Sequence, residues 1–247
     1  MADTIKIGSL DISAFKVGSS DCKVYLGSTL LYPQSPTPVF EGKYKLTLSD
    51  SSTVSAECDS TSAVTRGEVS SQYSGTVVSV EIGNCVTSIG DSAFQYCSSL
   101  TRIEIPDSVT SIGNYTFGFC SNLASINIPS GVTSIGNGTF YGCGSLTGIT
   151  IPNSVTSIGY YAFQYCSSLT RIEIPSGVTS ISNDAFYGCE GLSSVTCLAT
   201  TPPQLVEGTF NDTNNCPILV PLQSVEAYKS ASGWSTYASR IQAIPNS

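Results

Sequence analysis

The segment LTRIEIPDSVTSIGNYTFGFCSN at residues 100–122 is followed by three close copies of itself, LASINIPSGVTSIGNGTFYGCGS (123–145), LTGITIPNSVTSIGYYAFQYCSS (146–168) and LTRIEIPSGVTSISNDAFYGCEG (169–191). Each copy has 23 residues and follows the consensus LxxIxIPxxVTSIGxxxFxxCxx. A fixed period in this range predicts a solenoid, because one copy cannot bury its apolar residues alone and stacked copies can. Degenerate copies begin at Val77 and at Leu192, the second slipping by one residue at Phe210, so we expect about six coils.

The spacing within one copy predicts its local structure. Apolar and polar residues alternate over 102–105, which is typical of a short, half-buried strand, and Pro106 ends it because proline has no N–H to donate. Residues 109–112 form a second short extended piece. The apolar positions from 117 to 123 lie three apart and indicate a helical or 3₁₀ turn. We therefore predict parallel strands joined by short helical turns.

The phenylalanine and cysteine columns are the expected core. They comprise Phe94, Phe117, Phe140, Phe163, Phe186, Cys97, Cys120, Cys143, Cys166 and Cys189. Adjacent cysteines of the column could meet the Cα separation of a disulfide, but their side chains should point in parallel, so we interpret them as small buried thiols that fill space. Cys197 replaces a strand isoleucine and should also be core. The sequence leaves the state of Cys22, Cys58, Cys85 and Cys216 open, and it contains no CxxC pair typical of a zinc site.

The repeat resembles the BspA-like (Treponema-type) leucine-rich repeat of bacterial surface antigens over residues 77–215. This resemblance implies a right-handed arc with a parallel sheet, and a role in adhesion and binding to host proteins. The tail from Cys216, CPILVPLQSVEAYKSASGWSTYASRIQAI, resembles the cap that follows such repeats in gut Bacteroidetes proteins. We expect a small helical C-terminal cap over 216–247, with Ser224 as the N-cap of its helix. The residues expected to cover the last coil are Trp234, Tyr237, Ile241 and Ile244.

The segment before Val77 predicts two β-rich modules. Short strands are expected around 5–7, 12–17, 24–26 and 30–32 in a module spanning 1–36, whose end, KVYLGSTLLYP, resembles segments of phage virion and tail proteins of gut bacteria. The segment PQSPTP (33–38) is a stiff linker candidate. Residues 37–76 should form a β-rich N-terminal cap for the first coil, with disorder over 60–74 as the alternative.

Composition argues against several classes of function. The formal charge is −8 and the pI about 4.4, which opposes binding to nucleic acid or to anionic membranes. Histidine is absent, and with it the commonest general base and metal ligand. We expect no enzyme activity, no metal, no cofactor and no membrane insertion. Because no signal-peptide pattern follows Met1, we expect synthesis in the cytoplasm without Sec export.

The outward positions of the first strand are the candidate binding face. They are Arg102, Glu104, Ser125, Asn127, Thr147, Thr150, Arg171, Glu173, Ser194 and Thr196. Ligand contact competes here with a plainer interpretation, a solvated strand face with mild pairing of charges between coils. Tyrosines beside the Phe/Cys turn could stack on sugars, or could shield the convex side, which the sequence favours.

Two functions fit this pattern. The first is a phage virion attachment or decoration protein made in the host cytoplasm, whose N-terminal module docks to other virion proteins and could form a homo-oligomer. The alternative is a bacterial cell-surface adhesin. Both present the solenoid to a protein or cell-surface glycan.

Overall fold

The computed structural model describes residues 40–206 and 208–245, together with the backbone of four strands near the N-terminus. These are β1 (Ile5–Ile7), β2 (Leu10–Ile12), β3 (Tyr25–Leu26) and β4 (Thr29–Leu30). Each pair, β1 with β2 and β3 with β4, is antiparallel. The chain divides into two units between Val39 and Phe40, whereas the sequence suggested a boundary after residue 36. The strands expected at 13–17 and 31–32, and the linker at 33–38, lie outside the described residues.

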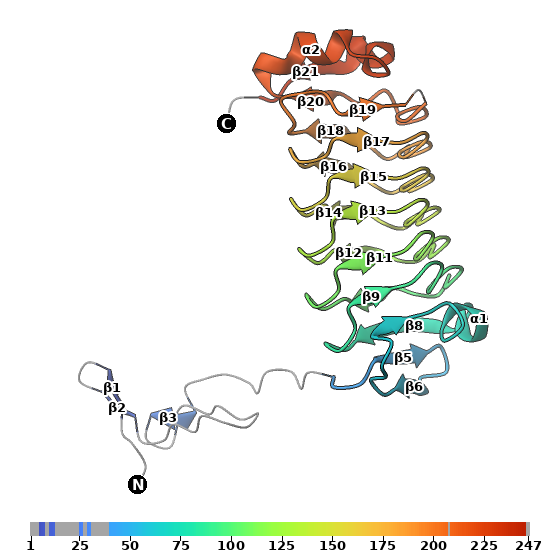
Figure 1. Cartoon of the computed structure of the whole chain (residues 1–247), viewed down its shortest axis with the longest axis vertical. Coiled ribbons are helices and arrows are strands. Elements are labelled where there is room, and N and C mark those ends of the chain that lie inside the picture. The colour runs from blue at the N-terminus through green and yellow to red at the C-terminus, as the bar shows by residue number, and fades with distance from the viewer. Residues whose placement is uncertain are drawn as a thin grey trace. The chain divides into compact units, whose positions relative to one another are not determined.

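The second unit is a solenoid, which confirms the predicted fold (Figure 1). Its first strand face carries one strand per coil: β8 (Val77–Ile82), β10 (Arg102–Glu104), β12 (Ser125–Asn127), β14 (Gly148–Thr150), β16 (Arg171–Ile174), β18 (Ser194–Cys197), β20 (Ile218–Val220) and β21 (Ile241–Ala243). The paired strands are parallel and the register advances by one repeat from coil to coil, as in Ile172↔Val195. This register continues into the C-terminal cap, where Ile218 pairs with Ile241.

A second strand face runs beside the first. It consists of β7 (Ala63–Val64), β9 (Ser88–Ile89), β11 (Ser111–Ile112), β13 (Ser134–Ile135), β15 (Ser157–Ile158), β17 (Ser180–Ile181) and β19 (Gln204–Leu205). Its strands are only two residues long because the VTSI segment has a single apolar residue pointing inward at each end. Ser157 pairs with Ser180, its equivalent in the next copy, but Ser180 pairs with Gln204, one position beyond its equivalent. This longer step is the origin of the slip at Phe210.

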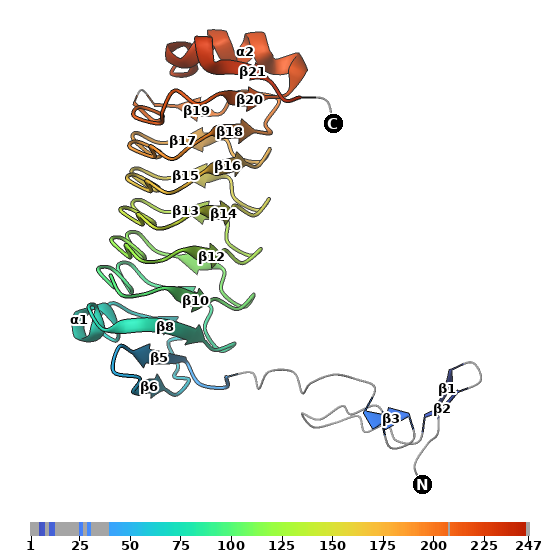
Figure 2. The same cartoon turned by 180° about the vertical axis from the view of Figure 1, so that it is seen from behind.

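Successive turns close each coil on its third side, seen as the stacked loops opposite the labelled first-face strands (Figure 2). The turns are held by i to i+3 bonds, such as Cys97 N to Phe94 O and Leu100 N to Cys97 O (3.1 and 3.0 Å), and form no continuous helix. The phenylalanines at their centre are fully buried. Their rings lie nearly parallel from Phe94 to Phe210, with successive centroids 5.2–5.6 Å apart. This stack is the spine of the core.

The repeat cysteines form a second buried column beside the rings. The thiol of Cys120 lies 3.1 Å from the carbonyl oxygen of Phe94 in the preceding coil, and Cys143 repeats the contact with Phe117. A thiol is small enough for the column and is also a weak donor to a carbonyl of the preceding coil. Burial raises the pKa of Cys143 to about 12, which keeps the thiol protonated and unreactive.

The N-terminal cap covers the first coil with an antiparallel hairpin. Strand β5 (Tyr44–Leu48) pairs with β8 on one side and with β6 (Thr53–Ala56) on the other, so the sheet edge that would otherwise be open is paired. Between β6 and β8 the chain forms β7 and the short helix α1 (Ser70–Tyr73), where the sequence had left disorder open.

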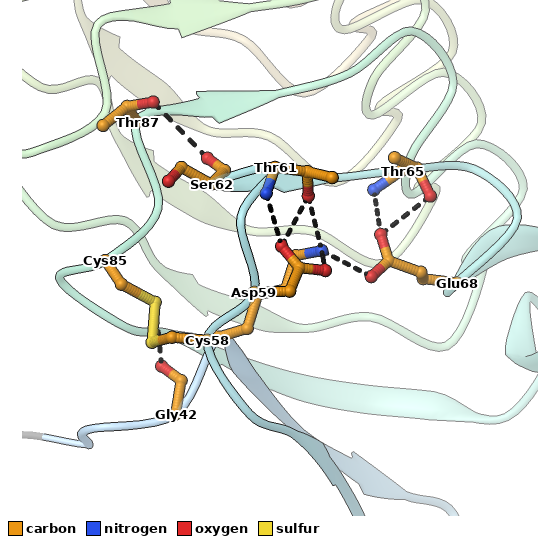
Figure 3. Close-up of polar contacts among 10 residues, drawn as sticks. Gly42, Cys58, Asp59, Thr61, Ser62, Thr65, Glu68, Cys85 and Thr87 are labelled. Carbon is orange, nitrogen blue, oxygen red and sulfur yellow. Dashed lines mark hydrogen bonds and ion pairs between the residues drawn. A yellow bond between two sulfur atoms is a disulfide. The ribbon is translucent and has the colours of Figure 1, made fainter.

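A buried lysine, Lys43, binds two carboxylates inside this cap, those of Asp59 and Glu68, which Figure 3 labels. Lys43 is 2% exposed, and its ammonium contacts the carboxylates of Asp59 (2.8 Å) and Glu68 (2.7 Å). Asp59 also accepts bonds from the backbone and hydroxyl of Thr61, and Glu68 accepts the same pair from Thr65. The buried ammonium is therefore paired with two partly exposed carboxylates, and such pairing is the condition for tolerating a buried charge.

A disulfide joins the cap to the first coil. Cys58, just after β6, is bonded to Cys85 in the loop after β8 (Figure 3). This settles two of the cysteines that the sequence left open. Cys216 is a buried free thiol, and Cys22 lies outside the described residues.

The C-terminal cap places an aromatic lid on the last coil. It contains η1 (Leu222–Ser224), α2 (Val225–Ser230) and η2 (Trp234–Arg240). Trp234 is fully buried against Phe210 (centroids 5.8 Å apart) and donates from Nε1 to Pro203 O (2.8 Å). Ser224 is the N-cap residue of α2, as predicted, but its hydroxyl makes no capping bond and donates instead to Thr200 O (2.8 Å), which anchors the helix to the preceding loop.

The phenylalanine stack should dominate stability. Phe140→Ala removes a ring between two others and should lower the free energy of unfolding by about 3–5 kcal/mol, measured by chemical denaturation. Tyr160→Ala, a half-exposed residue of the next coil, should change it by no more than about 0.5 kcal/mol. A loss of less than about 1 kcal/mol for Phe140→Ala would contradict the central place of this ring.

The Lys43 cluster should make the cap sensitive to acid. The hydrogen bond from Lys43 is the largest cause that lowers the pKa of Asp59, followed by the bonds from Thr61. Burial opposes ionisation of Glu68, but bonds from Lys43 and Thr65 outweigh it and lower the pKa of that carboxyl. Because the folded-state pKa values of both carboxyls are lowered, the contribution of the cluster to stability is complete above about pH 4.5. It is lost as the pH falls from there through the folded-state pKa values.

We therefore expect the melting temperature to fall more steeply below about pH 4.5 in the natural chain than in Lys43→Met, which lacks the shared partner. Lys45→Met is the matched control, since Lys45 is exposed and 3.9 Å from Glu81. Parallel melting curves for the natural chain and Lys43→Met across this range would show that the cluster does not set the acid sensitivity.

Candidate functional site

The first strand face gathers the predicted binding residues into two columns. Register places Ser125 beside Gly148 and Arg171 beside Ser194 in one column, and Asn127 beside Thr150 in the other. The predicted residues on β10, β12, β14 and β16 are exposed, whereas Ser194 and Thr196 near the cap are half-buried. The fold therefore brings the predicted set onto one surface, which we call the strand face.

One pair of opposite charges on the strand face lies within a single strand. Arg102 forms an ion pair with Glu104 of its own strand β10. The pairing between coils expected from the sequence is not what this pair shows, because residues two apart on a strand point to the same side. Between β10 and β12 lies an open groove of about 460 Å³, lined by residues including Arg102, Ser125 and Asn127.

One predicted position is engaged in holding the coils together. The hydroxyl of Thr147 donates to Ala124 O (3.3 Å), and its own carbonyl accepts the backbone N–H of Thr170 (3.2 Å). Thr170 repeats the contact with Thr147 through its own hydroxyl (3.1 Å). Thr147 is thus part of a ladder at the edge of the strand face and has less freedom to meet a ligand than Asn127 or Thr150.

The described residues hold no cluster suited to a metal ion, and none of their helices is long and apolar enough to cross a membrane. Burial raises the pKa of the repeat cysteines, and at Cys189 it raises the pKa to about 12. Their buried thiols are shaped for packing and lack the lowered pKa of a nucleophile.

A second exposed surface lies on the turn side. Its members are the aromatic residues that follow each buried phenylalanine, which we call the aromatic row: Tyr96, Phe119, Tyr141, Tyr165 and Tyr187. Successive ring centroids are 4.9, 4.8, 5.8 and 5.7 Å apart. Tyr96, Phe119 and Tyr165 are 53%, 37% and 47% exposed. The row is therefore a continuous aromatic surface.

Glycines make room for this row. Phe119 and Tyr165 follow the buried phenylalanine by two residues and have positive φ (61° and 60°), while Gly142 and Gly188 occupy the same place in the next coils. A Cβ at Gly188 would lie 2.6 Å from Cδ1 of the Tyr165 ring. Each ring therefore lies over the glycine of the following coil. The aromatic residue of that coil, Tyr141 or Tyr187, comes one residue before the glycine, directly after the buried phenylalanine. A left-handed backbone costs a side-chain-bearing residue about 1–2 kcal/mol, so the chain keeps these rings against local preference.

The sequence places these aromatic residues beside the Phe/Cys turn, with sugar stacking and shielding of the convex side as the two alternatives. It does not predict the contact between their rings, because the shift between the two positions hides it. The signal that could have revealed the row is the alternation of F-x-aromatic with F-aromatic-G between adjacent copies.

This geometry predicts unequal losses of stability at two equivalent positions of adjacent coils. Tyr165→Gly relieves the left-handed strain and should lower the free energy of unfolding by no more than about 1 kcal/mol. Gly188→Ala introduces the same strain and displaces the Tyr165 ring, and should cost at least about 1–2 kcal/mol. Chemical denaturation of both variants tests the arrangement, and a larger loss for Tyr165→Gly than for Gly188→Ala would contradict it.

Comparison with known proteins agrees with the fold. A Treponema pallidum leucine-rich-repeat protein of known structure is 29% identical with a TM-score of 0.53, and the match covers 74% of this chain and 80% of that one. A leucine-rich-repeat protein from Bacteroides ovatus ATCC 8483 is 38% identical with a TM-score of 0.45, over 55% of this chain; this chain spans 37% of its length. A leucine-rich cell surface protein from Faecalibacterium prausnitzii A2-165 is 24% identical with a TM-score of 0.44, covering 78% and 72%.

No curated protein sequence matches the chain. The family model for the BspA-type leucine-rich-repeat region matches residues 73–217 with 6 copies, in the segment where the structure shows the stacked coils. On this match, the chain belongs to the BspA-type leucine-rich-repeat family.

Proposed function

We propose that this chain is a non-enzymatic bacterial cell-surface protein that binds a protein or glycan through its strand face. Membership of the BspA-type family supports a role in binding and adhesion. The strand face supports the same role, because it is exposed, rich in small hydrogen-bonding side chains and continuous over several coils.

The observation that carries the surface location is the Cys58–Cys85 disulfide. Disulfides persist in oxidising compartments and are rare in a reducing cytoplasm. This bond joins the N-terminal cap to the first coil, where a stack of repeats would otherwise begin to fray. A cap that depends on oxidation suits a chain that works outside the cytoplasm.

The virion function rests on the resemblance of residues 23–33, of which the structure describes only the backbone of β3 and β4. It stays a prediction, as do virion partners and a homo-oligomer formed through that module. The family match supports the surface function instead.

Surface labelling tests the location. In intact producing cells, a membrane-impermeant amine reagent should label the chain through partly exposed lysines such as Lys45 and Lys229. Thiol alkylation before and after reduction should show that Cys58 and Cys85 become available only after reduction. Labelling that requires cell lysis, together with free thiols at both positions, would refute the surface location.

The same cells test the strand face. Asn127→Arg combined with Thr150→Arg places two bulky charges on adjacent strands and should reduce attachment of the cells at least tenfold. Ser111→Arg combined with Ser134→Arg, two exposed positions on the second strand face, is the matched control and should leave attachment unchanged. Equal attachment by both double variants would show that binding does not use the strand face.

A further inference from the structure

A polar cavity lies at the C-terminal end of the aromatic row. Its volume is about 690 Å³, and its lining includes Tyr187, Asp212, Asn215, Thr236 and Arg240. Tyr187 belongs both to the row and to the cavity wall, because its ring packs against Tyr165 (5.7 Å) and its side chain lines the cavity together with Asp212. The aromatic row therefore leads directly into a group of hydrogen-bonding side chains.

We propose that the aromatic row and this cavity form a binding track for an uncharged glycan chain. The proposal deepens the proposed function and rests on it, since it adds a ligand class and a second face to the same surface protein. Sugar rings pack their C–H faces on aromatic rings, and their hydroxyl groups need hydrogen-bonding partners beside those rings. The row supplies the first and the cavity supplies the second.

The orientation of the rings leaves surface for such a ligand. Within the row, only Tyr96 and Phe119 stack in parallel, with 8° between their planes. From Phe119 onward each ring stands at 74–83° to the next, so the row does not close into a single covered stack. Its regular advance from coil to coil suits a ligand that is itself a linear repeat.

Charge argues for an uncharged ligand. The turn segments 91–99, 114–122, 137–145, 160–168 and 183–191 contain no lysine or arginine, but they contain Asp91, Asp184 and Glu190. Arg240 in the cavity wall is already engaged, since it donates to the carbonyl oxygens of Phe210 (3.1 Å) and Cys216 (2.8 Å). A sulfated or otherwise anionic polymer would meet repulsion along these turns, which offer it no cation.

The available hydrogen-bonding groups favour a glycan over a proline-rich peptide. Proline-rich segments also dock on aromatic grooves, but their backbones offer mainly carbonyl acceptors and need donors from the protein. In the cavity, Asp212 is an acceptor and the guanidinium of Arg240 is occupied. Sugar hydroxyls can donate to Asp212 and accept from the amide of Asn215, so they match both kinds of group.

The test uses the purified full chain in affinity gel electrophoresis, with a soluble β-glucan, a galactomannan or an arabinoxylan in the gel. We expect retardation by at least one of these neutral polysaccharides. Tyr96→Gly combined with Tyr165→Gly should raise the dissociation constant at least tenfold, and so should Asp212→Ala. Glycine is the chosen replacement because Gly142 and Gly188 occupy this position in other coils, with φ of 68° at both.

Tyr160→Ala is the matched control, because Tyr160 is 50% exposed on the same coil as Tyr165 but contacts Tyr161 outside the row. It should bind like the natural chain. Melting temperatures within a few degrees of the natural chain would show that the row variants are folded. The proposal is overturned by an absence of retardation in all neutral gels, by equal binding of the row variants, or by binding confined to heparin or to a polyproline peptide.

These outcomes are separable from the surface location. A chain that is labelled on intact cells but ignores neutral polysaccharides keeps the proposed function and loses the glycan track. A chain that binds them through the row but is found only inside cells keeps the track and loses the surface function.

Discussion

The structure depends on one constraint: each coil must return to the same place after one repeat of the sequence. Backbone hydrogen bonds between coils join a residue to its equivalent in the next copy, as Thr170 N joins Thr147 O and Ser193 N joins Thr170 O. Because the same residue type recurs at the same position of each coil, identical side chains of successive coils are brought into contact. The phenylalanine stack, the thiol column and the threonine ladder are all results of this register.

The constraint also explains where the chain departs from the consensus. Both ends of a stack expose an unpaired coil, so each is closed by structure that does not repeat. The N-terminal end uses an antiparallel hairpin, a buried lysine and a disulfide, whereas the C-terminal end continues the sheet through β20 and β21 and covers the rings with Trp234. The longer step from Ser180 to Gln204 falls directly before this second cap, where Pro203 O accepts the tryptophan N–H.

Much of the fold follows from the repeat alone. Period and alternation predict both strand positions, and they align the residues that become the strand face. The contacts that hold the N-terminal cap together could not be predicted in the same way. Lys43, Cys58 and Cys85 are not part of a repeating pattern, and their partners are distant in sequence. The aromatic row is intermediate. Its residues are visible in the repeat, but their contact depends on a ring of one coil lying over a glycine of the next, which no single copy reveals.

The disulfide gives the stack a direction. In a structure where each coil contacts only its neighbours, separation proceeds from a free end, one coil after another. The covalent bond from Cys58 to Cys85 closes the N-terminal end. Under oxidising conditions, a pulling force or a protease should therefore unfold coils first from the C-terminal end, which Trp234 covers. Reduction of this disulfide would release the N-terminal end as well, so that unfolding could begin from both ends of the stack.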